Sequence, residues 1–279
     1  MTIRTDEVVG AAPRGRCRTV WSGTPWALLV PAVLGLAFLV VPLLGLLASA
    51  PWGTLLTRLG EPAVRDALLL SLVSATCATA ISLVFGVPLA WLIARTTIPG
   101  LRVVRALITV PLTLPPVVGG VALLLVLGRN GFIGRPLNDV FGITLPFSTL
   151  AVIIAEAFVA MPFLIVSVEG ALRAADLRYE EAAATLGASR WTVFRRVTLP
   201  MVAPGVMAGA TMCWARALGE FGATITFAGN FPGRTQTMPL AVYLAMQTDP
   251  QSAIVLSVVL LVVSLIVLAS LRDRWVGTP

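Results

Sequence analysis

Six long apolar runs constrain this chain more than any other feature of its sequence. They are Trp26–Leu47, Ala67–Ala94, Ile108–Leu127, Ser148–Val168, Gly205–Thr226 and Ile254–Leu271. Each run reaches the roughly 17–25 residues that an α-helix needs to cross a bilayer, and the second is longer. Only 12% of the residues are charged, against about 25% in a typical soluble domain. The sequence therefore predicts an all-α, polytopic integral membrane protein with six transmembrane helices.

The third apolar run contains three prolines, Pro111, Pro115 and Pro116. Proline removes a backbone donor and disturbs the helix that contains it. Broken helices occur within a membrane only where protein or a water-filled cavity surrounds them. We therefore expect this span to be kinked or partly unwound.

The arginines predict the topology, since all 20 basic residues of the chain are arginine. With the N-terminus inside, 14 of them fall in cytoplasmic segments and five on the opposite side, while Arg216 lies within a run. This asymmetry satisfies the positive-inside rule. It also explains the net charge of +7 better than nucleic-acid binding does. We expect a protein of the cytoplasmic membrane with both termini in the cytoplasm, residues 1–25 forming a disordered tail and residues 273–279 a short one.

The first run is followed by Ala48-Ser49-Ala50, which matches the small-residue pattern of a signal-peptide cleavage site. However, residues 26–47 exceed the roughly 7–15 apolar residues of a signal core, and Pro51 would follow the cut. A retained first transmembrane helix is the favoured interpretation.

The composition excludes most catalytic chemistry. The chain has no histidine and no lysine, which removes histidine bases, catalytic triads, most zinc sites and the nucleotide-binding P-loop, whose lysine is essential. Cys17, Cys77 and Cys213 are widely separated and lack ligand spacing. We expect no catalytic residue, metal site or cofactor in this chain. If ATP drives it, another subunit binds the ATP and Mg²⁺.

The longest polar interruption is Asp176–Pro200, between the fourth and fifth runs. Asp176 can cap a short helix that Gly187 ends, and Ser189 can cap a second one. Trp191, Phe194 and Val197 then share one face of the second helix. Each piece has roughly ten residues, too few for an isolated helix in water. Two such helices need a surface to dock against.

This loop resembles the EAA loop of the membrane subunits of ABC importers. The match consists of the spacing Glu181-Ala182-Ala183, Gly187, Val197 and Leu199-Pro200, with Val197 where isoleucine is usual. The resemblance implies that residues 169–203 form a cytoplasmic coupling loop that sits in a groove of the ATP-binding subunit. The coupling residues would be Glu181, Ala182, Ala183, Gly187, Leu199 and Pro200.

Charged residues inside the apolar runs are the second functional signal, because they are costly there and usually face a bundle interior or an aqueous path. Arg216 and Glu220 are four apart and can pair on one helix face. Glu156, in the fourth run, can partner Arg216 across helices or act as a packing hydrogen-bonder. Arg216, Glu220, Glu156 and Thr224 are the candidate residues of a translocation path. An ion pair that only fixes packing is an equal alternative.

The run Arg216–Tyr243, RALGEFGATITFAGNFPGRTQTMPLAVY, is similar to the membrane permeases of molybdate importers. By composition alone, residues 229–240 within it would be only a Gly/Pro-rich turn on the outer side. The resemblance implies the type I ABC importer permease fold, with five helices over residues 65–272. It also implies a homodimer, an ATP-binding cassette subunit on the cytoplasmic face and an extracytoplasmic molybdate-binding protein.

Two alternatives remain open. Sulfate and tungstate are tetrahedral dianions like molybdate, and a permease of the same class could carry either. A proton-coupled secondary transporter would instead use Glu156 and Glu220 as proton carriers, but it leaves the docking loop unexplained. A membrane enzyme is remote, since no nucleophile has a plausible base.

Overall fold

The computed structural model describes residues 26–276, and it divides into two units, Met1–Ala48 and Ser49–Pro279. The predicted tail of residues 1–25 and residues 277–279 lie outside the described part. In the first unit, α1 (Trp26–Ala48) is an apolar helix with no buried residue. Such a helix is apolar on all sides, as a membrane span requires.

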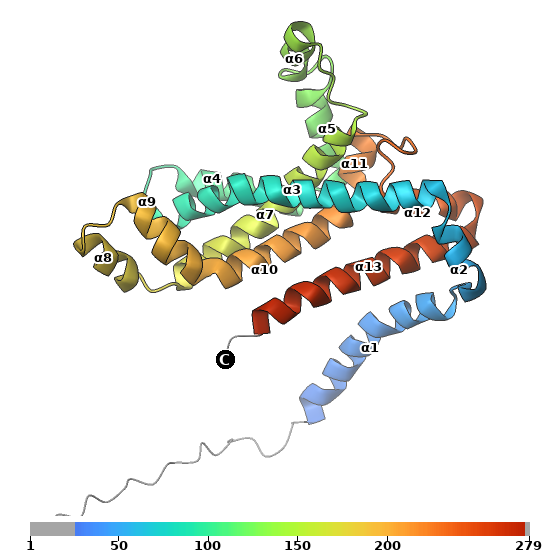
Figure 1. The fold of residues 1–279 in the computed structure, drawn as a ribbon, viewed down its shortest axis with the longest axis horizontal. Helices are drawn as coiled ribbons and strands as arrows, with labels where there is room; N and C mark the ends of the chain where they lie inside the picture. Colours follow the sequence, from blue (N-terminus) through green and yellow to red (C-terminus); the bar gives the residue numbers. More distant parts are fainter. Residues whose placement is uncertain (1–25, 277–279) are drawn as a thin grey trace, which may run out of the picture. The chain divides into compact units, whose positions relative to one another are not determined.

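In the described part of the second unit, all of the regular secondary structure is helical (Figure 1). Its elements are α2 (Trp52–Leu59), α3 (Pro62–Arg95), α4 (Leu101–Thr113), α5 (Pro116–Leu127), α6 (Gly134–Phe141), α7 (Thr149–Ala174), α8 (Arg178–Thr185), α9 (Arg190–Val193), the π-helix η1 (Phe194–Thr198), α10 (Leu199–Leu218), α11 (Gly222–Phe227), α12 (Met238–Thr248) and α13 (Pro250–Val276). Five described helical stretches, α1 included, are long and apolar enough to span a membrane, and α4 with α5 makes a sixth if the bent pair is one span. The predicted all-α membrane fold is confirmed.

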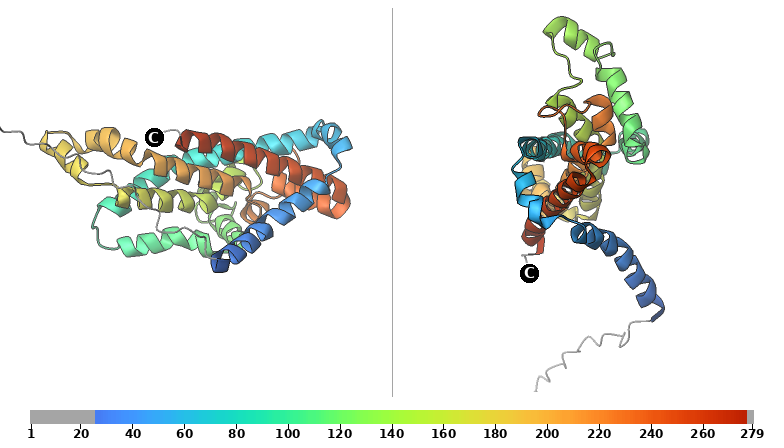
Figure 2. Two further views of the ribbon diagram at one scale, coloured as in Figure 1. Left: turned by 90° about the horizontal axis from the view of Figure 1, so that it is seen from below. Right: turned by 90° about the vertical axis from the view of Figure 1, so that its right-hand side faces the viewer.

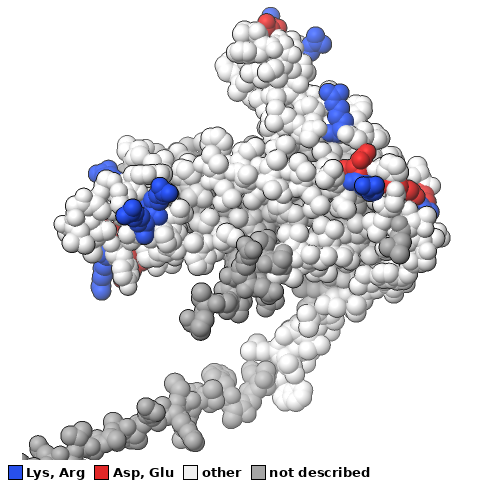
Figure 3. Space-filling view, in the orientation of Figure 1, with Lys and Arg blue, Asp and Glu red and all other residues white. Residues whose placement is uncertain are grey.

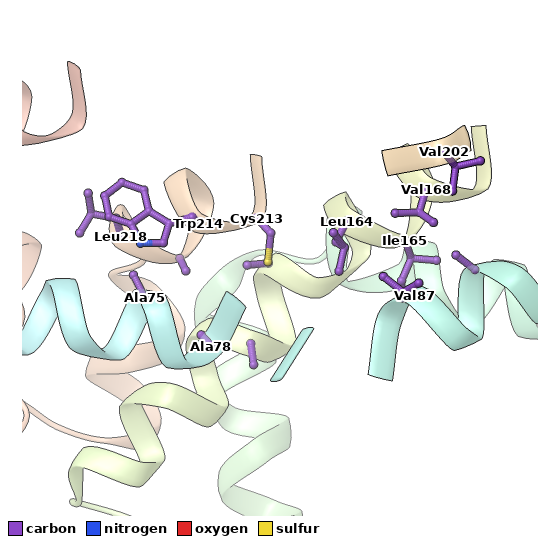
Figure 4. Packing of buried hydrophobic residues seen from close by; sticks show 14 of the residues in the cluster. Ala75, Ala78, Val87, Leu164, Ile165, Val168, Val202, Cys213, Trp214 and Leu218 are labelled. Atoms are coloured by element: carbon purple, nitrogen blue, oxygen red, sulfur yellow. The ribbon is translucent and has the colours of Figure 1, made fainter. Parts of the chain in front are cut away.

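The core of the second unit is built by α3, α7 and α10, which run side by side (Figures 1 and 2). Small and branched side chains meet there, including Ala75, Ala78, Leu164 and Cys213, all fully buried (Figure 4). A Cβ on Gly205 of α10 would overlap the Cβ of Ala171 on α7. Small residues let helix backbones approach closely. Such packing holds transmembrane helices together, because lipid tails are as apolar as the side chains and the hydrophobic effect does not drive helix association there.

The proline-rich third span is broken, as its sequence predicted. The axis turns by 117° between α4 and α5, and Leu114 and Pro115 at the break are extended or nearly so. Beyond the bend, α6 and the adjoining end of α5 project from the α3–α7–α10 bundle (Figures 1 and 2). The inner face of α5 packs against α11 and α7.

The fifth span differs from its prediction at both ends. Helix α10 starts at Leu199 and continues directly from α9 and η1, whereas the prediction began at Gly205. It stops at Leu218, and Gly222–Phe227 forms the separate helix α11, whereas the prediction ran unbroken to Thr226. The predicted outer turn also contains the start of α12, at Met238. Hydropathy alone does not detect such breaks, because the residues on either side of them are equally apolar.

Candidate coupling loop and translocation path

Asp176 and Gly187 lie at the two ends of α8, as the sequence predicted, although the N-cap position itself is Leu177, which makes no side-chain capping hydrogen bond. The Asp176 carboxylate accepts a hydrogen bond from the backbone N–H of Arg178, at 3.0 Å, and Glu180 and Glu181 occupy the first turn. At the other end Gly187 adopts a left-handed φ of +83°. The N–H of Gly187 donates to the carbonyl of Ala184 and that of Ala188 to the carbonyl of Ala183. This is a Schellman motif, in which glycine is the favoured residue.

The second half of the loop forms one continuous helical stretch with α10. The Ser189 hydroxyl accepts from the backbone N–H of Thr192 at 3.2 Å and so caps α9. The rings of Trp191 and Phe194 stack with centroids 5.7 Å apart, which confirms that they share a face. Leu199 and Pro200 follow η1 directly within this stretch. Pro200 has no N–H to donate to the preceding turn, and the π-helical turn lies immediately before it.

An ion pair that the sequence did not reveal ties α8 to the bundle. Arg95, the last residue of α3, lies with its Nη2 2.8 Å from Oε1 of Glu180. Both side chains are largely buried, at 10% and 17% exposure. They line a cleft of about 420 Å³ together with Glu181, Ala184 and Ala188. The signal available in the sequence was only an arginine at the end of one span and an acid in the loop.

The predicted coupling residues differ in how far they are exposed. Glu181, Ala182, Gly187 and Pro200 are exposed, while Ala183 and Leu199 are partly buried. A Cβ built on Gly187 meets no atom within 4 Å. Glu181, Ala182 and Gly187, on and just after α8, are therefore accessible to another chain.

Arg216 and Glu220 form the predicted ion pair, with Nη1 of Arg216 2.7 Å from Oε2 of Glu220. The acid, however, lies beyond the end of α10, because that helix stops at Leu218. The other oxygen of Glu220 accepts from the backbone N–H of Ala223 at 2.7 Å and so caps the start of α11. Glu220 is 1% exposed, while the arginine side chain is 27% exposed. The pair thus joins two helices and leaves part of the cation accessible.

Glu156 does not partner Arg216 among the described contacts. Its Oε1 accepts a hydrogen bond from the Ser74 hydroxyl on α3, at 2.8 Å, so the packing hydrogen-bond interpretation is the one observed. Within the described part of the chain, its Oε2 is buried without a hydrogen-bond partner, as is the hydroxyl of Thr224 on α11. A second serine of the same α3 face, Ser71, accepts from the N–H of Met238 at 2.7 Å. The structure buries Glu156, Thr224 and Glu220 and leaves Arg216 half-buried, and the contacts of the described residues do not join all four in one network.

The sequence model of the family described as "Binding-protein-dependent transport system inner membrane component" matches residues 82–277. The chain belongs to this family. The matched region contains the whole of the loop from α8 to η1, the Arg216–Glu220 pair and Glu156.

Named relatives and solved structures agree with the family. The Molybdenum transport system permease protein ModB of Mycobacterium tuberculosis is 46% identical over 89% of this chain and 94% of the relative. ModB of Escherichia coli is 42% identical over 76% and 93%. The Sulfate transport system permease protein CysT of Escherichia coli is 36% identical over 84% and 86%. A crystal structure of a bacterial ABC transporter involved in alginate import superposes with a TM-score of 0.70 at 18% identity, covering 91% of this chain and 96% of that chain.

Proposed function

We propose that this chain is the membrane-spanning permease subunit of an ATP-driven importer of molybdate. The observation that carries the proposal is the 46% identity to a molybdenum permease over 89% of the chain, which exceeds the 36% identity to a sulfate permease over a similar share. The run Arg216–Tyr243, on which the resemblance to molybdate permeases depends, lies within that match.

In this proposal the α8 surface is the contact for a separate ATP-binding subunit, and Glu181, Ala182, Ala183, Gly187, Leu199 and Pro200 are its coupling residues. Two facts support this role. The short helix α8 projects its exposed residues away from the chain's own core, and the Arg95–Glu180 pair connects it to α3. A displacement of α8 would therefore reach the bundle through an ionic contact as well as through the continuous helix α9–η1–α10.

Transport then requires differential affinity. ATP binding by the partner subunit must favour one state of the bundle over another, since a ligand shifts an equilibrium only by its difference in affinity for the two states. We further propose that two copies of the chain enclose one path, that an extracytoplasmic binding protein delivers the oxyanion, and that Arg216 presents positive potential to it. The partial exposure of Arg216 beside a buried Glu220 supports that assignment.

Uptake into vesicles tests the function. Vesicles whose membrane carries this chain and the ATP-binding subunit, with the binding protein outside, should accumulate molybdate only when ATP is inside. This uptake should continue when a protonophore collapses the proton gradient. Uptake that follows the proton gradient while ATP persists would favour the secondary transporter. Competition by sulfate and tungstate at equal concentration ranks the three oxyanions.

Reporter fusions test the proposed topology, in which both termini are cytoplasmic. A fusion at residue 185 should report the cytoplasm and one at residue 235 the outside. The reverse pattern would place α8 on the side where no ATP is present, and the coupling proposal would fail with it.

A further inference from the structure

A second cleft adjoins the first where α9 and η1 pass the end of α3, and Trp91, Arg190 and Phe194 line both. It encloses about 240 Å³ and is lined by Pro88, Trp91, Arg190, Trp191 and Phe194. The ring of Phe194 meets that of Trp91 edge-on at 6.2 Å and stacks on that of Trp191 at 5.7 Å. The cleft is thus an aromatic slot whose lining includes one charged side chain, that of Arg190.

The position of the cleft along α3 places it at the membrane surface. This helix has 34 residues, so it is about 51 Å long, against a hydrocarbon core of about 30 Å and about 40–45 Å with the headgroups. Trp91 and Pro88 precede the end of α3 at Arg95 by about 6 and 10 Å. With α3 centred on the bilayer, Trp91 lies at the headgroup level and Pro88 near the hydrocarbon boundary. Tryptophan is enriched at this depth in membrane proteins.

The charge around the cleft is unbalanced within the described part of the chain. Arg190, Arg195 and Arg196 are exposed on α9 and η1, and no ion pair with a described carboxylate is found for any of them. Other arginines at the same end are paired, Arg95 with Glu180 and Arg173 with Glu169. Figure 3 shows basic side chains gathered at the end that carries α8 and α9. The cluster therefore favours an anionic occupant.

We propose that this cleft binds one anionic phospholipid, whose phosphate pairs with Arg190 and whose glycerol and first acyl carbons lie against Trp91, Trp191 and Phe194. Basic pockets beside transmembrane helices are suited to anionic headgroups. A cytoplasmic protein can reach α8 but cannot reach the depth of Pro88 in the bilayer. A lipid already lies at that depth. The proposal goes beyond the transport function and does not depend on which oxyanion is carried.

The proposal is tested by the lipid retained on the full-length chain after purification in detergent. Native mass spectrometry would compare phosphatidylglycerol with phosphatidylcholine for wild type, R190Q, W191A and the control R178Q, which removes an exposed arginine of α8 that does not line the cleft. One basic residue near an anionic surface contributes about a five-fold change in affinity. We expect R190Q to lower phosphatidylglycerol retention about that much, W191A to lower it too, and R178Q to leave it unchanged. Thermal unfolding of each variant identifies any that is misfolded.

Four results would overturn the proposal. R190Q could retain as much phosphatidylglycerol as wild type, or phosphatidylcholine could be retained equally well. Displacement of the lipid by millimolar glycerol phosphate would show that the site takes soluble phosphates. Displacement by the purified ATP-binding subunit would assign the cleft to that protein. Normal ATP-driven uptake by R190Q together with lost lipid would separate this site from the transport function.

Discussion

The guanidinium of Arg95 lies 2.8 Å from the carboxylate of Glu180, and this contact joins the last residue of α3 to the first turn of α8. Because both side chains are at least four-fifths buried, the pair is shielded from the solvent screening that weakens surface ion pairs. The exposed coupling surface therefore has a rigid attachment to the bundle.

We expect R95Q and E180Q each to destabilise the chain and to reduce the ATPase activity that transport substrate stimulates in the reconstituted complex. A double-mutant cycle on unfolding in detergent should give an interaction of roughly 0.5–3 kcal/mol, the range for residues in direct contact. The exchanged pair R95E/E180R should recover part of both losses. Strictly additive effects in the cycle would show that the contact contributes nothing.

Gly187 gives a second test of the coupling loop. Its φ of +83° is left-handed, which costs other L-residues about 1–2 kcal/mol, while asparagine tolerates it better. A Cβ at Gly187 meets open space, so substitution strains the backbone without a clash inside this chain. We expect a bulky residue such as valine to abolish coupled uptake while membrane insertion persists, and G187N to retain most of it. Normal uptake by G187V would contradict the docking proposal.

The features of this loop that the sequence predicted are those whose interacting residues are close together along the chain. The caps at Asp176, Ser189 and Gly187 connect residues two to five apart, so local side-chain chemistry predicts them. The Arg95–Glu180 contact spans 85 residues, and its formation depends on how α3 and α8 are packed. A single sequence carries no signal for that packing.

The fifth span shows the same limit inside the membrane. The spacing of Arg216 and Glu220 predicted their pairing, which is confirmed. The helix end between them was not predicted from the sequence. At this break the Glu220 carboxylate accepts a hydrogen bond from the backbone N–H of Ala223 at the start of α11. The partner that Glu156 contacts, Ser74, is likewise 82 residues away.

The two roles of Arg216 can be separated by charge removal. R216Q leaves Glu220 buried without its cation. Removing one partner of a fully buried pair costs roughly 3–5 kcal/mol, and the cost is smaller here because the arginine side chain is 27% exposed. The double variant R216Q/E220Q removes both charges. If the pair only fixes packing, the double variant should regain stability and uptake together. We expect it to regain thermal stability but not oxyanion uptake, because the positive potential is absent. Recovered uptake would favour the packing role.

Asp249 gives a pH-dependent test outside the spans. Hydrogen bonds from the hydroxyl and backbone N–H of Ser252, with a further contribution from Arg58, lower the pKa of this carboxyl. A carboxyl whose pKa is lowered by folding stabilises the fold above its unfolded pKa of about 3.9, and the contribution is lost as the pH falls through the folded pKa. We expect D249N to unfold at a lower temperature than wild type at pH 7. The difference should shrink as the pH falls below about 3.9 and vanish below the lowered pKa of the folded protein. An unchanged difference at pH 3 would contradict this origin.

The packing of α5 on α11 gives a prediction with a matched control. A Cβ on Gly120 would lie 2.8 Å from both the carbonyl oxygen of Ala223 and the Cβ of Thr226, whereas a Cβ on Gly170 of α7 meets nothing within 4 Å. Overpacking a tight contact costs about 1–3 kcal/mol, while alanine in place of an unhindered helical glycine gains roughly 0.5–1 kcal/mol. We expect G120A to lower the unfolding temperature in detergent and G170A to raise it or leave it unchanged. Because α11 begins at the residues that Glu220 caps, G120A should also weaken uptake more than G170A does. Equal effects of the two variants would show that the α5–α11 contact is not tight in the membrane.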